Sequence, residues 1–168
     1  MNLSFDASEF VQLADLWKRA PDITRTRLLQ AVTACDVELL ATLKQNLPRG
    51  AGGSAGLAGS VQTDEHALAD NVIGMTFTAQ PYAQYVEIGT QPHIAPIQPL
   101  LDWVRVKFGL LDLAAKNAAY AIRAAIAKRG TKANPVWQQT WDAKQGFIND
   151  QFDDAVDAIA RDLSGGVA

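Results

Sequence analysis

Apolar residues recur every three or four positions along most of the chain, which predicts a largely helical protein. Residues 8–19 and 22–46 both show this spacing. Pro21 stands between them and predicts the end of one helix and the start of the next. The apolar stripe of the second helix is Leu28, Val32, Cys35, Leu39 and Leu43.

Two short segments, 57–63 and 71–78, have the pattern of strands. In the second, Ile73, Met75 and Phe77 alternate with glycine and threonine, so they share one face of a strand. A polar loop joins the two segments and predicts a hairpin. Because a lone hairpin is marginally stable in water, the preceding long helix is its expected cover.

Three further helices are expected after the hairpin, at residues 98–108, 112–129 and 136–163. Gly109 is the expected stop of the first. The predicted fold class is therefore α+β, with a long N-terminal helix over a small antiparallel sheet and further C-terminal helices. At 168 residues the chain is expected to form one domain.

Five glycines occur within residues 49–60, "RGAGGSAGLAGS", and predict a mobile loop at 49–59. A phosphate-binding loop is disfavoured here. The stretch lacks a Gly-Lys-Ser/Thr ending, and it follows a predicted helix rather than a strand.

Charge is modest in total but uneven along the chain. The net charge of −3 predicts no strong attraction to nucleic acid. Residues 102–132 carry seven Lys/Arg against two Asp/Glu, whereas residues 133–168 carry two against six. A basic segment followed by an acidic one suggests a contact between them, within one subunit or between two.

Cys35 is the one cysteine, so no internal disulfide is expected and a reducing cytoplasm is the natural compartment. Its place in an apolar stripe predicts a core residue. The first 20 residues do not have the pattern of a signal peptide, and no apolar run approaches the length of a membrane helix.

Residues 82–96, "YAQYVEIGTQPHIAP", concentrate the candidate chemistry. A metal site is not expected, because His66 and His93 have no second ligand at a suitable spacing. Glu87 has no carboxylate partner nearby in the sequence, and Ser54 and Ser60 lie in the glycine-rich loop, so no catalytic set assembles. No cofactor is implied, and a structural or interaction protein is favoured over an enzyme.

Three stretches in this order are similar to a known family: "LPRGAGGSAGLAGSV", "YAQYVEIGTQPHIAP" and the segment from "IAKRGTKANPVWQQTW" into the last helix. Together they resemble the neck and tail-completion proteins of long-tailed bacteriophages, the group that includes lambda minor tail protein Z. This chain has Pro135-Val136-Trp137 where the family often has Pro-Phe, and it lacks the Asp-Thr-Gly often seen in the glycine loop. Residues 97–129 form a helical insertion between the second and third stretches.

The resemblance implies a virion protein, made in the host cytoplasm, that forms a ring at the head–tail junction, six-fold or a multiple of six. Its implied partners are further copies of itself and neighbouring head-connector and tail proteins. DNA could pass through such a ring, but no sequence-specific DNA binding and no membrane are implied. The candidate interface residues are Tyr82, Tyr85, Glu87, Gly89, Thr90, His93, Arg105, Lys107 and Trp137.

Glu87 has two open roles. It would either accept hydrogen bonds from backbone amides within its own loop or pair with a basic group from the 105–132 segment of a neighbouring subunit. Two other functions also stay open: a small non-enzymatic binding protein of a mobile element, and a hydrolase that uses Glu87 and His93.

Overall fold

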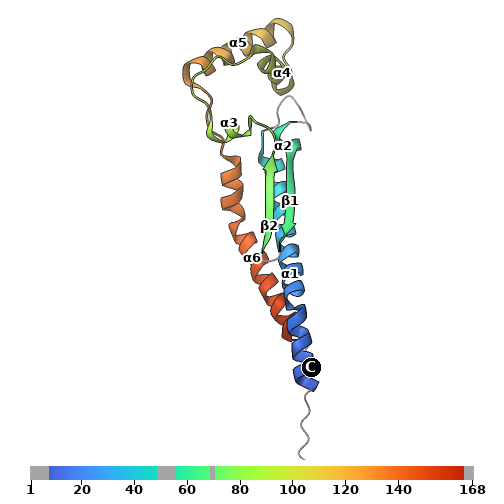
Figure 1. The fold of residues 1–168 in the computed structure, drawn as a ribbon. Helices are drawn as coiled ribbons and strands as arrows, with labels where there is room; N and C mark the ends of the chain where they lie inside the picture. The colour runs from blue at the N-terminus through green and yellow to red at the C-terminus, as the bar shows by residue number, and fades with distance from the viewer. Residues whose placement is uncertain (1–7, 49–55, 69–70, 165–168) are drawn as a thin grey trace, which may run out of the picture. The chain divides into compact units, whose positions relative to one another are not determined.

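The computed structural model describes residues 8–48, 56–68 and 71–164, and for residues 8–13 it describes the backbone alone. Its elements are α1 (Ser8–Asn46), α2 (Leu57–Ser60), β1 (Val61–Ala67), β2 (Val72–Thr78), α3 (Ala83–Ile88), α4 (Ile97–Phe108), α5 (Asp112–Arg129) and α6 (Val136–Ser164) (Figure 1). β1 and β2 form a two-stranded antiparallel sheet. The predicted α+β class is confirmed.

The described residues group into two compact units. One consists of residues from 1–38, 63–75 and 144–168, and the other of residues from 39–62 and 76–143. Since α1, the hairpin and α6 continue from one unit into the other, the chain crosses the boundary several times. The expectation of one domain stays a prediction.

In the first unit, β2 approaches α1 closely at Gly74. A Cβ at this position would lie 2.3 Å from Oδ2 of Asp36 and 2.6 Å from Cγ1 of Val32. Val32 and Asp36 are both buried, and Cys35 is buried beside them. The core position expected for Cys35 is therefore confirmed, and burial raises the pKa of its thiol, with a smaller effect from Asp36.

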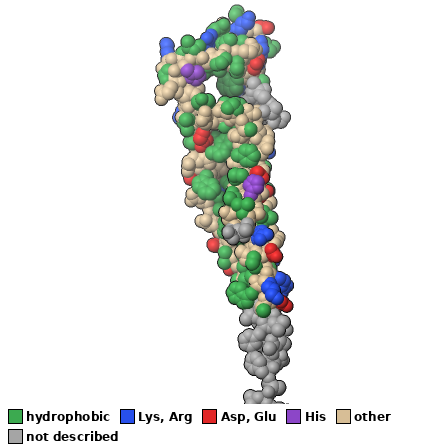
Figure 2. All heavy atoms as spheres, in the orientation of Figure 1, with side chains coloured by type: hydrophobic (Ala, Val, Ile, Leu, Met, Phe, Trp, Pro, Cys, Tyr) green, Lys and Arg blue, Asp and Glu red, His purple; other side chains and the backbone are tan. Residues whose placement is uncertain are grey.

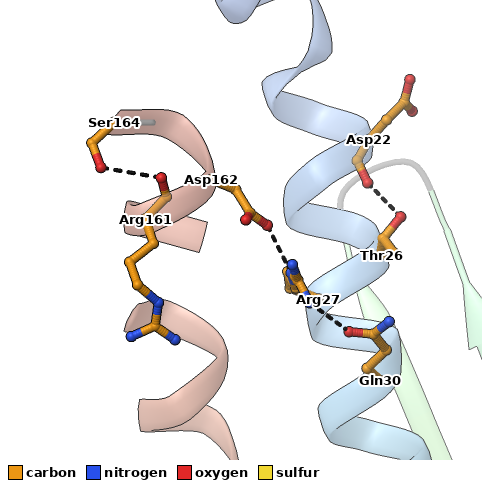
Figure 3. Close-up of polar contacts among 7 residues, drawn as sticks. All are labelled: Asp22, Thr26, Arg27, Gln30, Arg161, Asp162 and Ser164. Atoms are coloured by element: carbon orange, nitrogen blue, oxygen red, sulfur yellow. Dashed lines mark hydrogen bonds and ion pairs between the residues drawn. The ribbon is translucent and has the colours of Figure 1, made fainter. Parts of the chain in front are cut away.

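The same unit pairs α1 with the C-terminal part of α6. The Arg27 guanidinium donates from Nε to Oδ2 of Asp162 at 2.8 Å (Figure 3). Lys144 and Glu38 form a second ion pair between the two helices. The Arg27 hydrogen bond holds the pKa of the Asp162 carboxyl below its usual range.

The second unit contains two apolar clusters. The first joins the end of α1, the α2–β1 turn and the start of α6 through buried residues Leu43, Leu47, Leu57, Val61 and Val136. The second lies between α4 and α5, where Val104 packs against Ala115 and Ala119. Small residues on α5 allow its backbone to approach α4 closely.

Helix α1 is continuous through Pro21, so the predicted break into two helices is wrong. A proline inside a helix removes one backbone hydrogen bond and usually bends the helix without necessarily ending it. Residues on both sides keep the helical spacing, and Leu16 on one side and Ala31 on the other are buried. The remaining helix hydrogen bonds and this packing stabilise α1 by more than the one hydrogen bond that Pro21 removes.

The start of the hairpin also differs from the expectation. Residues 57–60 form a helical turn, and β1 runs on to Ala67 through the residues predicted as a polar loop. Leu57 is buried in the first apolar cluster. Residues 49–55 of the expected mobile loop lie outside the described residues. In contrast, β2, α4 with its stop at Gly109, α5 and α6 match their predicted positions.

The apolar face of β2 points away from α1. Ile73, Met75 and Phe77 are 41%, 42% and 42% exposed, while the opposite face carries Gly74 against α1. The helix covers the hairpin as expected, but on the face with glycine and threonine. In Figure 1 the strands β1 and β2 lie in front of α1. Figure 2 has the same orientation and shows hydrophobic side chains exposed on this front side.

Candidate functional site

The segment from Tyr82 to Pro96 holds most of the candidate interface residues, and it begins with a helix that the sequence pattern does not predict. Helix α3 follows Tyr82 and ends at Gly89, whose φ is 75°. A six-residue helix is too short to show a clear apolar period, so its presence is decided by packing. Its residues Ala83 and Val86 pack against the first apolar cluster of the second unit.

Glu87, near the end of α3, accepts two hydrogen bonds from the start of α6. The backbone N–H of Trp137 donates to Oε2 at 3.0 Å, and that of Gln138 donates to Oε1 at 2.9 Å. The first N–H groups of a helix have no partner within the helix, and a negative charge is favoured there. Glu87 thus has the intramolecular role of the two that the sequence left open, although its partners lie fifty residues away and not in its own loop.

Backbone hydrogen bonds between Thr90 and Thr131 form a second link between the end of α3 and the chain that leads into α6. The backbone N–H of Thr90 donates to the carbonyl oxygen of Thr131 at 3.2 Å, and the N–H of Thr131 donates back to that of Thr90 at 3.3 Å. The two hydroxyls lie 3.0 Å apart. Asn134 adds a third backbone link, from its N–H to the carbonyl oxygen of Val86 at 2.9 Å.

This Gly-Thr clasp, formed by residues 89–90 and 130–131, requires glycine at both of its corners. A Cβ at Gly89 would lie 2.5 Å from the carbonyl oxygen of Thr131, and one at Gly130 would lie 1.8 Å from that of Thr90. Both glycines also have positive φ, which side chains disfavour. The clasp therefore closes the base of the excursion that carries α4 and α5.

Gly130, Thr131 and Asn134 belong to this site, and sequence reasoning did not select them. The available signal was the repeated Gly-Thr pair, which occurs at 89–90 and again at 130–131. The two Gly-Thr turns can hydrogen-bond to each other only if the chain between them folds back to its starting point. That return is a property of the packing of α4 on α5, and the pair of turns alone does not reveal it.

An open cleft of about 640 Å³ lies beside the clasp. Four of the candidate residues line it, namely Tyr85, Gly89, Thr90 and His93, and Ile88, which lines it as well, has 72% of its surface exposed. The His93 ring nitrogen Nδ1 lies 3.0 Å from the carbonyl oxygen of Gln91, within the same loop. The full lining is Tyr85, Ile88, Gly89, Thr90, Gln91, Pro92, His93 and Thr131.

The lining of this cleft mixes apolar and polar side chains. It contains no carboxylate and no cysteine, and its two hydroxyl-bearing threonines already bond to each other in the clasp. The rest of the lining is apolar at Ile88 and Pro92 and polar at Gln91 and His93, with Tyr85 as its aromatic residue. Across residues 8–48, 56–68 and 71–164, no group of three or more His, Cys, Asp or Glu side chains is arranged to hold a metal ion.

The other candidate residues lie apart from the cleft lining. Tyr82 is half-exposed before α3, and Arg105 and Lys107 are exposed in the last turn of α4. Arg105 makes an exposed ion pair with Asp102 of its own helix at 3.5 Å. Trp137 packs against the first apolar cluster, so its side chain supports the core of its own unit.

Comparison with protein-family models, with curated proteins and with solved structures finds no match to this chain. None of the helices in the described part of the chain is both long and apolar enough to cross a membrane.

Proposed function

We propose that this chain is a virion structural protein of a long-tailed phage or prophage, and that it forms a ring at the head–tail junction as a neck or tail-completion component. The family assignment rests on the three resembling sequence stretches. The geometry explains why two of these stretches occur together. The Glu87 hydrogen bonds and the Gly-Thr clasp join Tyr82–Pro96 to the stretch after Arg129.

The observation that carries the assembly role is the number of large apolar side chains left exposed. Exposed examples occur on β2, α3, α5 and α6, among them Met75, Ile88, Leu113 and Val156. Apolar residues scattered singly are normal on a monomer, but exposed ones that share a face, as Ile73, Met75 and Phe77 do on β2, are typical of a surface that a partner covers. We infer that several of these faces are covered in the assembled particle.

The hydrolase alternative is not favoured by the position of Glu87. Both of its carboxylate oxygens accept hydrogen bonds from the start of α6, so neither is directed at a substrate. His93 bonds within its own loop and has no carboxylate among its partners in the described residues. A general base must be positioned within hydrogen-bond reach of the proton that it removes, and the Glu87 carboxylate is positioned against α6.

The experiment that tests the proposal is an in-frame deletion of the gene in the phage or prophage that encodes it. We expect induced lysates to contain filled heads and separate tails, and a plasmid copy to restore joined particles. Electron microscopy should then find a tagged copy at the junction. Joined, infectious particles at wild-type yield from the deletion would contradict the proposal, and a changed lysogeny or growth phenotype without a particle defect would favour a mobile-element binding protein.

A further inference from the structure

Helix α5 has an outer face that combines large apolar residues with positive charge. Leu113 and Tyr120 are 70% and 55% exposed and lie two turns apart on one side of the helix. Lys116 and Arg123 lie along the edge of this stripe, while Ala115 and Ala119 on the other side are buried against α4. In the described residues neither Lys116 nor Arg123 takes part in an ion pair.

The C-terminal part of α6 has an outer face of the opposite charge. Phe152 and Val156 are 37% and 59% exposed and lie one turn apart. Asp153 and Asp157 border them and are exposed. Next to Phe152 around the helix lie the buried Ala155 and the ion pair of Asp162 with Arg27, where α6 meets α1.

Asp153 and Asp157 also lack ion-pair partners among the residues that the structure describes. Acidic side chains therefore stand beside an exposed apolar stripe on α6, as basic ones do on α5. An apolar centre with a charged border is the usual composition of a specific protein interface. The two helices present such surfaces with complementary charge.

We propose that the outer face of α5 in one copy of this chain docks on the outer face of α6 in the next copy. Like charges would oppose contact of α5 with α5 or of α6 with α6, so the favoured contact joins two different faces. Repetition of such a contact adds subunits in one direction and closes into a ring when the rotation permits. This inference rests on the ring role proposed above and names the surface through which the copies meet.

Reciprocal charge reversal tests the contact. We expect the wild-type chain to associate in sedimentation velocity at low salt, and Lys116→Glu/Arg123→Glu and Asp153→Lys/Asp157→Lys each to weaken the association at least about 100-fold. An equimolar mixture of the two variants should associate again, because every α5–α6 contact between unlike copies then joins opposite charges. The chain that carries all four reversals should associate by itself.

Matched controls use charges on the same helices outside these faces. Arg129→Glu on α5 and Asp154→Lys on α6 change the same charges at exposed positions on the side of each helix away from its exposed apolar stripe. We expect both to associate like the wild type, and circular dichroism with thermal melting should show that all variants are folded. Raising the salt from low to molar concentration should weaken association of the wild type and of the mixture alike.

Three outcomes would overturn the inference. If the wild type associates and the reversals leave it unchanged, the copies meet elsewhere and the ring proposal still stands. If the mixture fails to restore association, the two faces do not touch each other. If the wild type stays monomeric at all concentrations, this contact does not form between copies, and the phage deletion experiment decides the proposed function separately.

Discussion

The residue types of the Tyr82–Pro96 segment suggest a functional surface, and those of strand β2 suggest a buried core strand. The structure shows the opposite in both places. The first is rich in polar and titratable side chains, yet Glu87 and the Gly-Thr clasp are used to hold backbone groups of the same chain. The second alternates apolar residues as a core strand does, yet Ile73, Met75 and Phe77 remain about two-fifths exposed. Polar residues can therefore be architectural, and an apolar period does not tell whether the covering surface belongs to the same chain.

The largest expected effect comes from Gly130→Ala, which breaks the clasp. The added Cβ would lie 1.8 Å from the Thr90 carbonyl oxygen at a φ of 71°, so the two turns must separate. We expect the free energy of unfolding to fall by about 3 kcal/mol or more in urea denaturation. Gly109→Ala is the matched control, because its φ is 64° with no atom within 4 Å, and a loss of about 1 kcal/mol is expected. Equal losses would show that the clasp contributes little.

Gly74→Ala applies the same test to the hairpin. Its Cβ would meet Asp36 and Val32, so β2 must move away from α1, and a loss of about 2 kcal/mol is expected. Gly146→Ala in α6 is the control. This glycine has open space around it, so alanine should raise the stability by about 0.5 to 1 kcal/mol through its better helix propensity. A neutral Gly74→Ala would mean that the hairpin does not rest on α1 as described.

Glu87→Ala removes the acceptor for two amides at the start of α6. We expect the subunit itself to lose about 1–3 kcal/mol, measured by thermal melting of dilute protein. Glu87→Gln keeps one carbonyl acceptor and should lose less. If Glu87→Ala melts like the wild type but no longer assembles, the carboxylate acts between subunits and the architectural interpretation of this segment is wrong.

Met75→Thr probes the exposed face of β2 without changing the preference for a strand. Because Met75 is 42% exposed, the isolated subunit should change in stability by about 1 kcal/mol or less. Leu43→Ala in the first apolar cluster, at 2% exposure, should cost about 2–5 kcal/mol. Similar losses for the two variants would show that the outer face of β2 is packed within the subunit.

The smallest effect is expected at the half-exposed pair of Arg27 and Asp162. The folded pKa of Asp162 lies below its unfolded value, so the pair stabilises the fold above the unfolded pKa and loses this effect as the pH falls through the folded one. We expect wild type and Asp162→Asn to differ in melting temperature at neutral pH and to converge in acid, below about pH 4. A constant difference down to pH 2 would show that this pair does not set it.

Long helices were predictable from the sequence because their apolar stripes repeat over many turns. Helix α5 begins and ends where the pattern places it, and α4 stops at Gly109, which has the left-handed conformation expected of a helix stop. Short elements were not predictable in the same way. Helices α2 and α3 have four and six residues, too few to show a period, and they form where the first apolar cluster holds them.

The sequence by itself determined the helical content, the hairpin, the burial of Cys35 and the uneven charge of α5 and α6, because each depends on residues that are near one another in the chain. Only the tertiary structure decided that α1 continues through Pro21, which face of β2 meets it, and that Glu87 reaches the amides of Trp137 and Gln138. These outcomes depend on which distant segment supplies the partner. A local pattern shows that a group needs a partner, but the fold of the whole chain selects which one it obtains.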